Sequence, residues 1–347
     1  MIKRIPKLFW VLIVSISACA CSKGDTGGTT VNTDPPSNLS VKAVVNPDNS
    51  GNVAFTATAT NAVSYDYDYG NGIYATVSSG VVTYKYPSSG TYSVNVIAKS
   101  SSGKVISQSI SVTVVVTMSL IFSDEFDTPG APNTSKWGYD IGTGSGGWGN
   151  NELQYYTNRS TNATVSNGTL KITAIKESFS GSAYTSARLL SQNKFSFKYG
   201  KVEVRAKLPA GVGTWPAIWM LGNNITTAGW PNCGEIDIME HRGSELNKIF
   251  GTFHYPGRSG GNADGNTLTI ANATTEFHIY SAEWSASSIK LFVDGQLIHT
   301  LNNSTSLPFN QNFFMILNVA MGGNFAGSVD PAFSSATMEI DYVRVYQ

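Results

Sequence analysis

The feature that most limits the fold of this chain is a period of two residues in its apolar positions. Val53, Phe55 and Ala57 alternate with threonines, and similar short runs recur between turn sequences. Such alternation indicates half-buried β-strands. Gly, Ser, Thr and Asn are abundant, which favours strands and turns, and helical periodicity is not sustained from residue 120 onward. We therefore predict an all-β fold.

The chain has 347 residues, more than the roughly 100 to 200 residues of an average domain. Alternating runs and turns over residues 38–117 predict a small antiparallel sandwich. Residues 119–347 contain every tryptophan except Trp10 and many further strand sequences. We predict that this second segment is a two-sheet jelly-roll sandwich, whose concave face could carry a long substrate.

Charge and cysteine content exclude several classes of protein. Lys and Arg together number 23, as do Asp and Glu, so no overall positive field exists to bind nucleic acid. Beyond the amino-terminal region, Cys233 is the sole cysteine, which excludes an intramolecular disulfide framework. A thiol nucleophile would need a base partner that the sequence does not identify, so we interpret Cys233 as a buried residue.

The first residues have the pattern of an export signal. A basic start, an apolar stretch over residues 8–16 and small residues before Cys19 predict a signal peptide over residues 1–18. The cleavage sequence resembles the lipobox of bacterial lipoproteins, which implies lipidation of Cys19, with Cys21 as a second choice and an ordinary secretory signal as the alternative. Residues 19–37 are polar and rich in Gly and Pro, as in a flexible tether. We expect an exported protein, lipid-anchored to the bacterial outer membrane or cell surface.

Three acids occupy one predicted strand. Glu235 and Asp237 share a face because side chains alternate along a strand. Strict alternation would turn Glu240 into the core, where a lone carboxylate costs several kcal/mol. A single β-bulge at Ile238 and Met239 shifts the register by one residue and returns Glu240 to the face of Asp237.

Carboxyl groups in one row repel one another when ionised, so the pKa of at least one of them rises. One group can then stay protonated near neutral pH while another stays ionised. Glycoside hydrolysis needs this division between a general acid and a nucleophile or base. Outer carboxyls about 5 to 5.5 Å apart would imply a retaining mechanism. An exposed acidic strand or a structural metal site is the alternative interpretation.

The run from Glu235 to Glu240 resembles the E-x-D-x-x-E signature of glycoside hydrolase family 16, in its bulged, laminarinase-like form. The resemblance implies a concanavalin-like β-jelly-roll. It also implies that Glu235 is the nucleophile, that Glu240 is the acid/base, and that Asp237 tunes their protonation. The expected activity is retaining, endo-acting cleavage of internal β-1,3 bonds in laminarin-type β-glucans.

Other segments resemble the substrate cleft of the same family. Two tryptophans of one parity, roughly 13 Å apart in an extended strand, suit stacking on separate sugar rings. For these residues the alternatives are core packing for the tryptophans, a plain loop around residue 150, a surface ion pair for the arginine and a structural role for the histidine. The substrate-binding residues implied by the resemblance are Trp148, Asn150, Arg188, Trp215, Trp219, His254 and Asn318.

Family members often hold a structural calcium ion between the two ends of the domain. The resemblance implies the carbonyls of Glu125 and Gly168 and the carboxylate of Asp341 as ligands, and oxygen donors suit this cation. The alternative is a domain without metal. No cofactor is expected for catalysis.

Residues 67–72 and 84–92 resemble the strand and turn signature of the PKD domain, with Tyr67 and Asn71 where Trp and Asp are usual. The resemblance implies an immunoglobulin-like sandwich that acts as a spacer. Sugar binding by exposed tyrosines is the alternative function.

We expect a monomer that binds β-glucan, is held at a membrane by its lipid anchor and does not bind nucleic acid. Rival substrates are mixed-linkage β-1,3-1,4-glucan, agarose and carrageenan, with transfer to another sugar as a rival reaction. A non-catalytic glycan-binding lipoprotein and a scaffold for polysaccharide uptake remain open, since this architecture also occurs in lectins.

Overall fold

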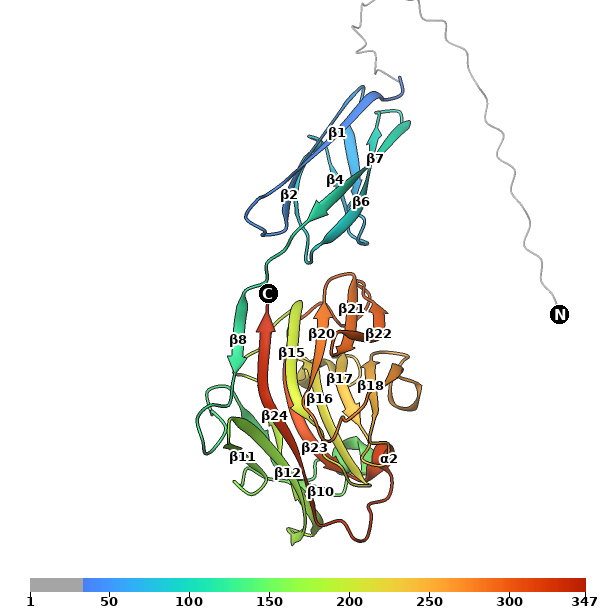
Figure 1. Cartoon of the computed structure of the whole chain (residues 1–347). Coiled ribbons are helices and arrows are strands. Elements are labelled where there is room, and N and C mark those ends of the chain that lie inside the picture. The colour runs from blue at the N-terminus through green and yellow to red at the C-terminus, as the bar shows by residue number, and fades with distance from the viewer. Residues whose placement is uncertain (1–33) are drawn as a thin grey trace, which may run out of the picture.

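The structure is a computed structural model that describes residues 34–347. Strands dominate these residues and form a smaller and a larger body (Figure 1). The predicted signal peptide, Cys19 and the tether up to residue 33 lie outside the described residues. Within residues 34–347, no helix has the length and apolar character needed to cross a membrane.

The smaller body is a sandwich of a three-stranded sheet, in the order β1-β2-β5, and a four-stranded sheet, in the order β4-β3-β6-β7. All of its strand pairs are antiparallel, which agrees with the sequence prediction. Its strands are β1 (Ser37–Val45), β2 (Asn52–Thr60), β3 (Ser64–Asp68), β4 (Tyr74–Val77), β5 (Val81–Lys85), β6 (Gly90–Lys99) and β7 (Val105–Val114).

Most tyrosines of the smaller body belong to its core or pack against it, whereas Tyr74 is 70% exposed. Tyr67, Tyr69 and Tyr86 are at most 2% exposed, and the ring of Tyr84 stacks on Tyr69 at 3.9 Å between centroids. The hydroxyl of Tyr67 donates to the Gly80 carbonyl, so a buried tyrosine fills the position where tryptophan is usual. These buried rings are packing residues of the sandwich, and sugar binding by an exposed tyrosine such as Tyr74 stays a prediction.

The larger body has one ten-stranded and one seven-stranded sheet. Within the ten-stranded sheet, β24 lies between β12 and β15, and β8 pairs with β24 beyond the end of β12. The strands of this sheet are β8 (Leu120–Asp124), β10 (Gln154–Tyr156), β11 (Ala163–Ser166), β12 (Thr169–Phe179), β13 (Ser182–Ser186), β15 (Gly200–Lys207), β20 (His278–Trp284), β21 (Ser288–Val293), β22 (Gln296–Asn302) and β24 (Ser335–Tyr346).

The seven-stranded sheet has the order β19-β18-β17-β16-β23-β14-β9 and carries the three acids on β17, an interior strand between β18 and β16. Its strands are β9 (Gly138–Asp140), β14 (Arg188–Leu190), β16 (Thr214–Gly222), β17 (Glu235–His241), β18 (Lys248–His254), β19 (Asp264–Thr269) and β23 (Phe313–Met321). Short helical turns complete the body: η1 (Gly147–Asn151), α1 (Ile225–Ala228), η2 (Gly260–Asn262) and α2 (Gly323–Ala326).

The main apolar core of the larger body includes inward side chains of both sheets, and a smaller apolar cluster that contains Cys233 and Phe314 is separate from it. β23 is buried at all nine positions, which its sequence FFMILNVAM explains, since Asn318 is its one polar residue. A buried amide is costly unless it is hydrogen-bonded. Asn318 therefore needs hydrogen-bond partners.

Candidate active site

A β-bulge in β17 brings the three acids to one face. Ile218 of β16 pairs with Met239. The next residue of β16, Trp219, pairs with Asp237, so Ile238 is the extra residue of the bulge. Both apolar residues of the bulge are fully buried. The predicted bulge is confirmed, and it turns Glu240 away from the apolar core.

Glu240 is 8% exposed and accepts two hydrogen bonds from the neighbouring strands. The indole Nε1 of Trp215 donates to Oε1 at 3.0 Å, and the hydroxyl of Thr252 donates to Oε2 at 3.2 Å. Burial nevertheless raises the pKa of this carboxyl, since desolvation outweighs the two donors. Glu240 is thus a buried acid with an elevated pKa and a fixed orientation.

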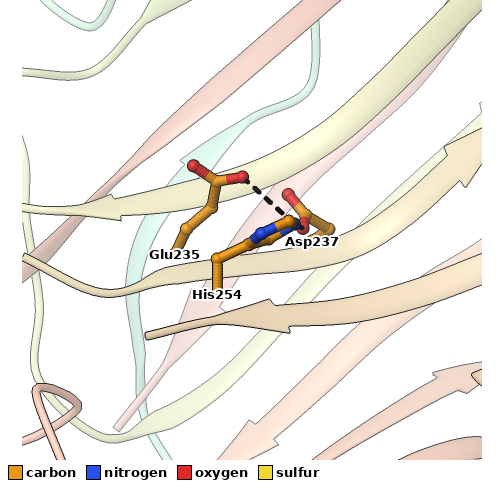
Figure 2. Close-up of side chains that lie close together, drawn as sticks. All are labelled: Glu235, Asp237 and His254. Atoms are coloured by element: carbon orange, nitrogen blue, oxygen red, sulfur yellow. Dashed lines mark ion pairs between the residues drawn. The ribbon is translucent and has the colours of Figure 1, made fainter. Parts of the chain in front are cut away.

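Glu235, Asp237 and His254 form a second group on the same face (Figure 2). The Nε2 atom of His254 lies 3.2 Å from Asp237 Oδ2 and 3.7 Å from Glu235 Oε1. On the other side of Glu235, Trp230 Nε1 donates to Oε2 at 3.0 Å. A carboxylate at position 235 therefore has a donor on one oxygen and the imidazole beside the other.

The row of acids holds fewer negative charges than carboxyl groups at neutral pH. Burial, followed by the charge of Asp237, raises the pKa of Glu235 to about 8. Burial and the charge of Glu240 raise the pKa of Asp237 well above its usual range. When Asp237 carries a proton, its repulsion of Glu235 disappears. Protonation of the middle residue thus favours ionisation of the outer one.

The tautomer of His254 is set by a backbone contact. The Gly260 N–H donates to Nδ1 at 3.2 Å, so neutral His254 carries its proton on Nε2, the nitrogen that lies beside Asp237. The nearest ligand atoms of Glu235, Asp237 and His254 lie within 4.8 Å of one another, a spacing compatible with a metal ion. A metal would take the Nε2 lone pair and require a proton on Nδ1, facing the Gly260 donor. This group therefore does not fit a metal site.

Arg188 is held between two of the predicted tryptophans. Its guanidinium carbon lies 4.5 Å from the ring centroid of Trp148 and 4.8 Å from that of Trp219. Its Nε lies 3.0 Å from Asp140 Oδ2. The ion pair that we considered as an alternative is present, but the stacking on both indoles places Arg188 in the same cluster as the aromatic residues.

The remaining predicted binding residues also lie on or beside this face. Trp219 Nε1 donates to Asn318 Oδ1 at 2.7 Å. The ring of Trp215 lies 4.9 Å from that of Phe325. Both tryptophans are half-buried, and Trp219 also packs against a small cluster of buried apolar residues. Asn150, in the turn η1, donates a hydrogen bond from Nδ2 to Glu152 Oε1 at 3.3 Å.

Several residues of the site were missed by the sequence analysis. The amide of Asn318 donates to the hydroxyl of Tyr156 at 3.0 Å. Glu152 and Tyr156 belong to the segment that holds Trp148. The contacts of Glu152 lie within this segment, whereas the contact of Tyr156 with Asn318 depends on a strand distant in sequence. For Trp230, the signal was its place five residues before Glu235 in a loop with Gly and Pro.

Strand register brings the segments that contain the predicted calcium ligands near one another. Leu170 pairs with Ile340 and Asp124 pairs with Val343, so the turn before β12 and the end of β8 both approach the part of β24 that contains Asp341. The carboxylate of Asp341 accepts a hydrogen bond from Arg205 at 2.6 Å. The oxygen donors suit calcium, which would have to share this carboxylate with Arg205.

Comparisons with known proteins give the same arrangement of domains. Residues 150–344 match Glycosyl hydrolases family 16, and residues 38–116 match the PKD domain.

Three relatives represent the similarity of the larger body. A "Beta-glucanase" of Rhodothermus marinus is 45% identical over 66% of this chain and 85% of its own length. A "Glucan endo-1,3-beta-glucosidase" of Cryptopygus antarcticus is 38% identical over 65% of this chain and 90% of its own. The X-ray structure of the laminarinase from Rhodothermus marinus superposes with a TM-score of 0.64, at 45% identity, over 67% of this chain and 98% of its own. With this similarity and three acids brought to one face by a bulge, the chain belongs to glycosyl hydrolase family 16.

Proposed function

We propose that this protein is an endo-β-1,3-glucanase that hydrolyses laminarin-type glucans with retention of configuration. The single observation that carries the proposal is the bulge in β17, which places Glu235, Asp237 and Glu240 on one face. The names of the relatives from Rhodothermus marinus and Cryptopygus antarcticus support the β-1,3-glucan substrate.

The reaction proceeds by double displacement. The carboxylate of Glu235 attacks the anomeric carbon, and Glu240 gives its proton to the glycosidic oxygen as the bond to that oxygen breaks. Glu240, now ionised, takes a proton from a water molecule, which attacks the anomeric carbon and releases Glu235. The elevated pKa of Glu240 suits a general acid, and the Trp230 donor stabilises the charge on Glu235.

The substrate-binding roles rest on the aromatic and polar residues beside the acids. Trp215, adjacent to Glu240, and Trp148, stacked on Arg188, offer indole surfaces for sugar rings. The terminal nitrogens of Arg188 donate to no other protein group among residues 34–347, so they are available to sugar hydroxyls.

The test is hydrolysis of laminarin, lichenan, agarose and carrageenan by the whole protein, measured as new reducing ends and as product size. We expect laminarin to be cut into oligosaccharides of several lengths, with the initial product in the β-anomeric form by NMR. Hydrolysis of agarose without hydrolysis of laminarin would contradict the substrate. Laminarin binding without turnover would favour a non-catalytic glycan-binding protein.

We also propose that the protein is exported, lipidated at Cys19 and anchored at the outer membrane or cell surface as a monomer. The pattern of residues 1–18 supports this placement. Mass spectrometry of the mature amino terminus tests it, with a diacylglyceryl-modified Cys19 as the expected result and an unmodified first residue as the contradicting one.

A further inference from the structure

Glu152 is the common acceptor of three side chains beside the cleft. Gln154 Nε2 donates to Oε2 at 2.7 Å, and the hydroxyl of Tyr156 donates to the same oxygen at 3.2 Å. Asn150 Nδ2 donates to Oε1 at 3.3 Å. The other side of Gln154 is fixed, because its Oε1 accepts the backbone N–H of Met321 at 2.7 Å.

From Glu152 a chain of hydrogen bonds leads to a cleft tryptophan. The Tyr156 hydroxyl donates a hydrogen bond to Glu152 and accepts one from Asn318 Nδ2 at 3.0 Å. Asn318 Oδ1 accepts from Trp219 Nε1 at 2.7 Å. Tyr156 is fully buried and Asn318 is 5% exposed, so neither group can exchange its partner for bulk water without cost.

The direction of this hydrogen-bond chain is fixed at its tryptophan end. An indole N–H can only donate. Trp219 therefore requires the oxygen of the Asn318 amide, which leaves the amide nitrogen for Tyr156. Tyr156 must then donate onward to Glu152. Each group has one allowed orientation, and the position of the Trp219 ring is determined by residues on β10 and β23.

The chain reaches Arg188 through the aromatic rings. The guanidinium lies over the ring of Trp219 and over that of Trp148. The ring of Tyr156 also lies 5.8 Å from that of Trp148. Trp148 belongs to η1 and has a positive φ of 55°, so the turn itself supplies less support than a strand would. Tyr156 thus contacts one indole through its ring and orders the other through Asn318.

We propose that Glu152 and Tyr156 are positioning residues, which hold Trp219 and Trp148 so that Arg188 is fixed between them for binding of the glucan. The inference rests on the proposed function, because it assigns the work of these residues to substrate binding by Arg188. Neither residue touches the reacting atoms, so their loss should act on KM and leave kcat nearly unchanged.

Tyr156→Phe keeps the ring and removes the two hydrogen bonds that the Tyr156 hydroxyl makes. We expect KM for laminarin to rise about three- to tenfold, as for the loss of one or two buried hydrogen bonds, with kcat within about twofold. Glu152→Met removes the carboxylate oxygens that accept these hydrogen bonds, so it should give a similar rise of KM. Glu152→Gln can still turn an oxygen toward Tyr156, so it should restore KM to within about twofold of the unsubstituted value.

Tyr155→Phe is the matched control, because Tyr155 is the neighbour of Tyr156 on β10 and packs against Phe179, outside the hydrogen-bond chain that links Glu152 to Trp219. A double-mutant cycle with Arg188→Ala gives the sharper test. If the chain acts through Arg188, Tyr156→Phe should change KM by less than about twofold in the Arg188→Ala background. An equal rise of KM in both backgrounds would overturn the proposal, as would an unchanged KM in the Tyr156→Phe variant.

A crystal structure of the Tyr156→Phe variant provides a measurement that needs no substrate. We expect the Trp219 ring and the Arg188 guanidinium to leave their stacked positions while Glu235, Asp237 and Glu240 stay in place. An unchanged Arg188 would contradict the inference. Failure of the unsubstituted protein to cut laminarin would instead count against the proposed function, and the crystal structure would still decide the positioning roles.

Discussion

At the scale of single residues, the site depends on hydrogen-bond donors that hold buried carboxyl groups in one orientation. Trp230 donates to Glu235, and Trp215 and Thr252 donate to Glu240. Without such donors, burial would leave both acids protonated and equivalent. The donors hold each group in one orientation, while repulsion within the row keeps their protonation states different, which general acid and nucleophile require.

Replacement of the proposed nucleophile separates the two chemical steps. Glu235→Ala should abolish turnover of laminarin, because no carboxylate attacks the anomeric carbon. Added azide can attack that carbon in place of the carboxylate, and Glu240 remains to protonate the leaving oxygen. We expect rescued turnover and a glycosyl azide of the inverted, α-anomeric form, identified by NMR. Retained wild-type turnover in the Glu235→Ala variant would rule out the assignment.

The hydroxyl of Thr252 offers a test of the acid/base residue. Its hydrogen bond favours the ionised form and so lowers the pKa of Glu240. Thr252→Val should therefore raise that pKa by about half to one pH unit, as expected for the loss of one hydrogen bond. The proposed acid works while protonated, so the alkaline limb of kcat/KM against pH should move upward.

Thr252→Ser keeps the hydroxyl and is the matched control, for which no shift is expected. An alkaline limb that stays in place in the Thr252→Val variant would mean that another group controls it.

At the scale of elements, the bulge in β17 brings the three acids to one face. Deletion of Met239 should remove the bulge and place Glu240 on the face of Glu235 and Asp237 by strict alternation. We therefore expect the deletion variant to keep measurable hydrolysis of laminarin, scored as new reducing ends, because the three acids still share one face. Met239→Leu conserves volume and should keep activity and most of the stability. Complete loss of hydrolysis in a deletion variant that is folded by circular dichroism would show that a shared face is not sufficient for the acids to act together.

This local logic explains which parts of the site were predictable from sequence. The bulge follows from the order of acidic and apolar residues between Glu235 and Glu240, because strand alternation and the cost of a buried charge act within one segment. The contact of Gly260 with His254 and that of Tyr156 with Asn318 depend on register between strands and on how a loop folds back. Such long-range geometry has no local pattern.

The fold was predictable for a similar reason. The alternation of Val53, Phe55 and Ala57 with polar residues predicts that these three side chains share a buried face, and all three are buried in the structure. The tyrosines of the smaller body were harder to place, since a tyrosine suits either a surface or a core when its hydroxyl finds a partner. Tyr67 finds one in the carbonyl of Gly80, in a turn thirteen residues away.

Three strands of the larger body meet at the predicted calcium site. If calcium binds there, it should raise the melting temperature of the protein, because an ion that binds the folded state stabilises it. EDTA should lower the melting temperature, and Asp341→Asn should remove most of the difference between the two conditions. Glu339→Gln, on the same strand but paired with Lys171 and Lys207, is the control. Equal melting temperatures with calcium and EDTA would exclude the site.

At the scale of the whole molecule, the two bodies have separate apolar cores. Phe55, Tyr67 and Val94 belong to the core of the smaller body, while β17 and its neighbours belong to the core of the larger one. Each core is closed by its own pair of sheets. Residues that share one apolar core unfold together, so two bodies with separate cores should unfold as separate units. The positions of the catalytic acids should then not depend on whether the smaller body is folded.

Phe55→Ala tests this independence in the full chain. Phe55 is fully buried, and truncation of such a side chain costs about 3 to 5 kcal/mol, a large part of the stability of a small domain. Calorimetry should show two transitions in the unsubstituted protein. In the variant, one transition should move to lower temperature or disappear, while the other keeps its midpoint and hydrolysis of soluble laminarin keeps its rate. A shift of both transitions together would show that the two cores unfold as one, and the smaller body would then be part of the scaffold that holds the acids.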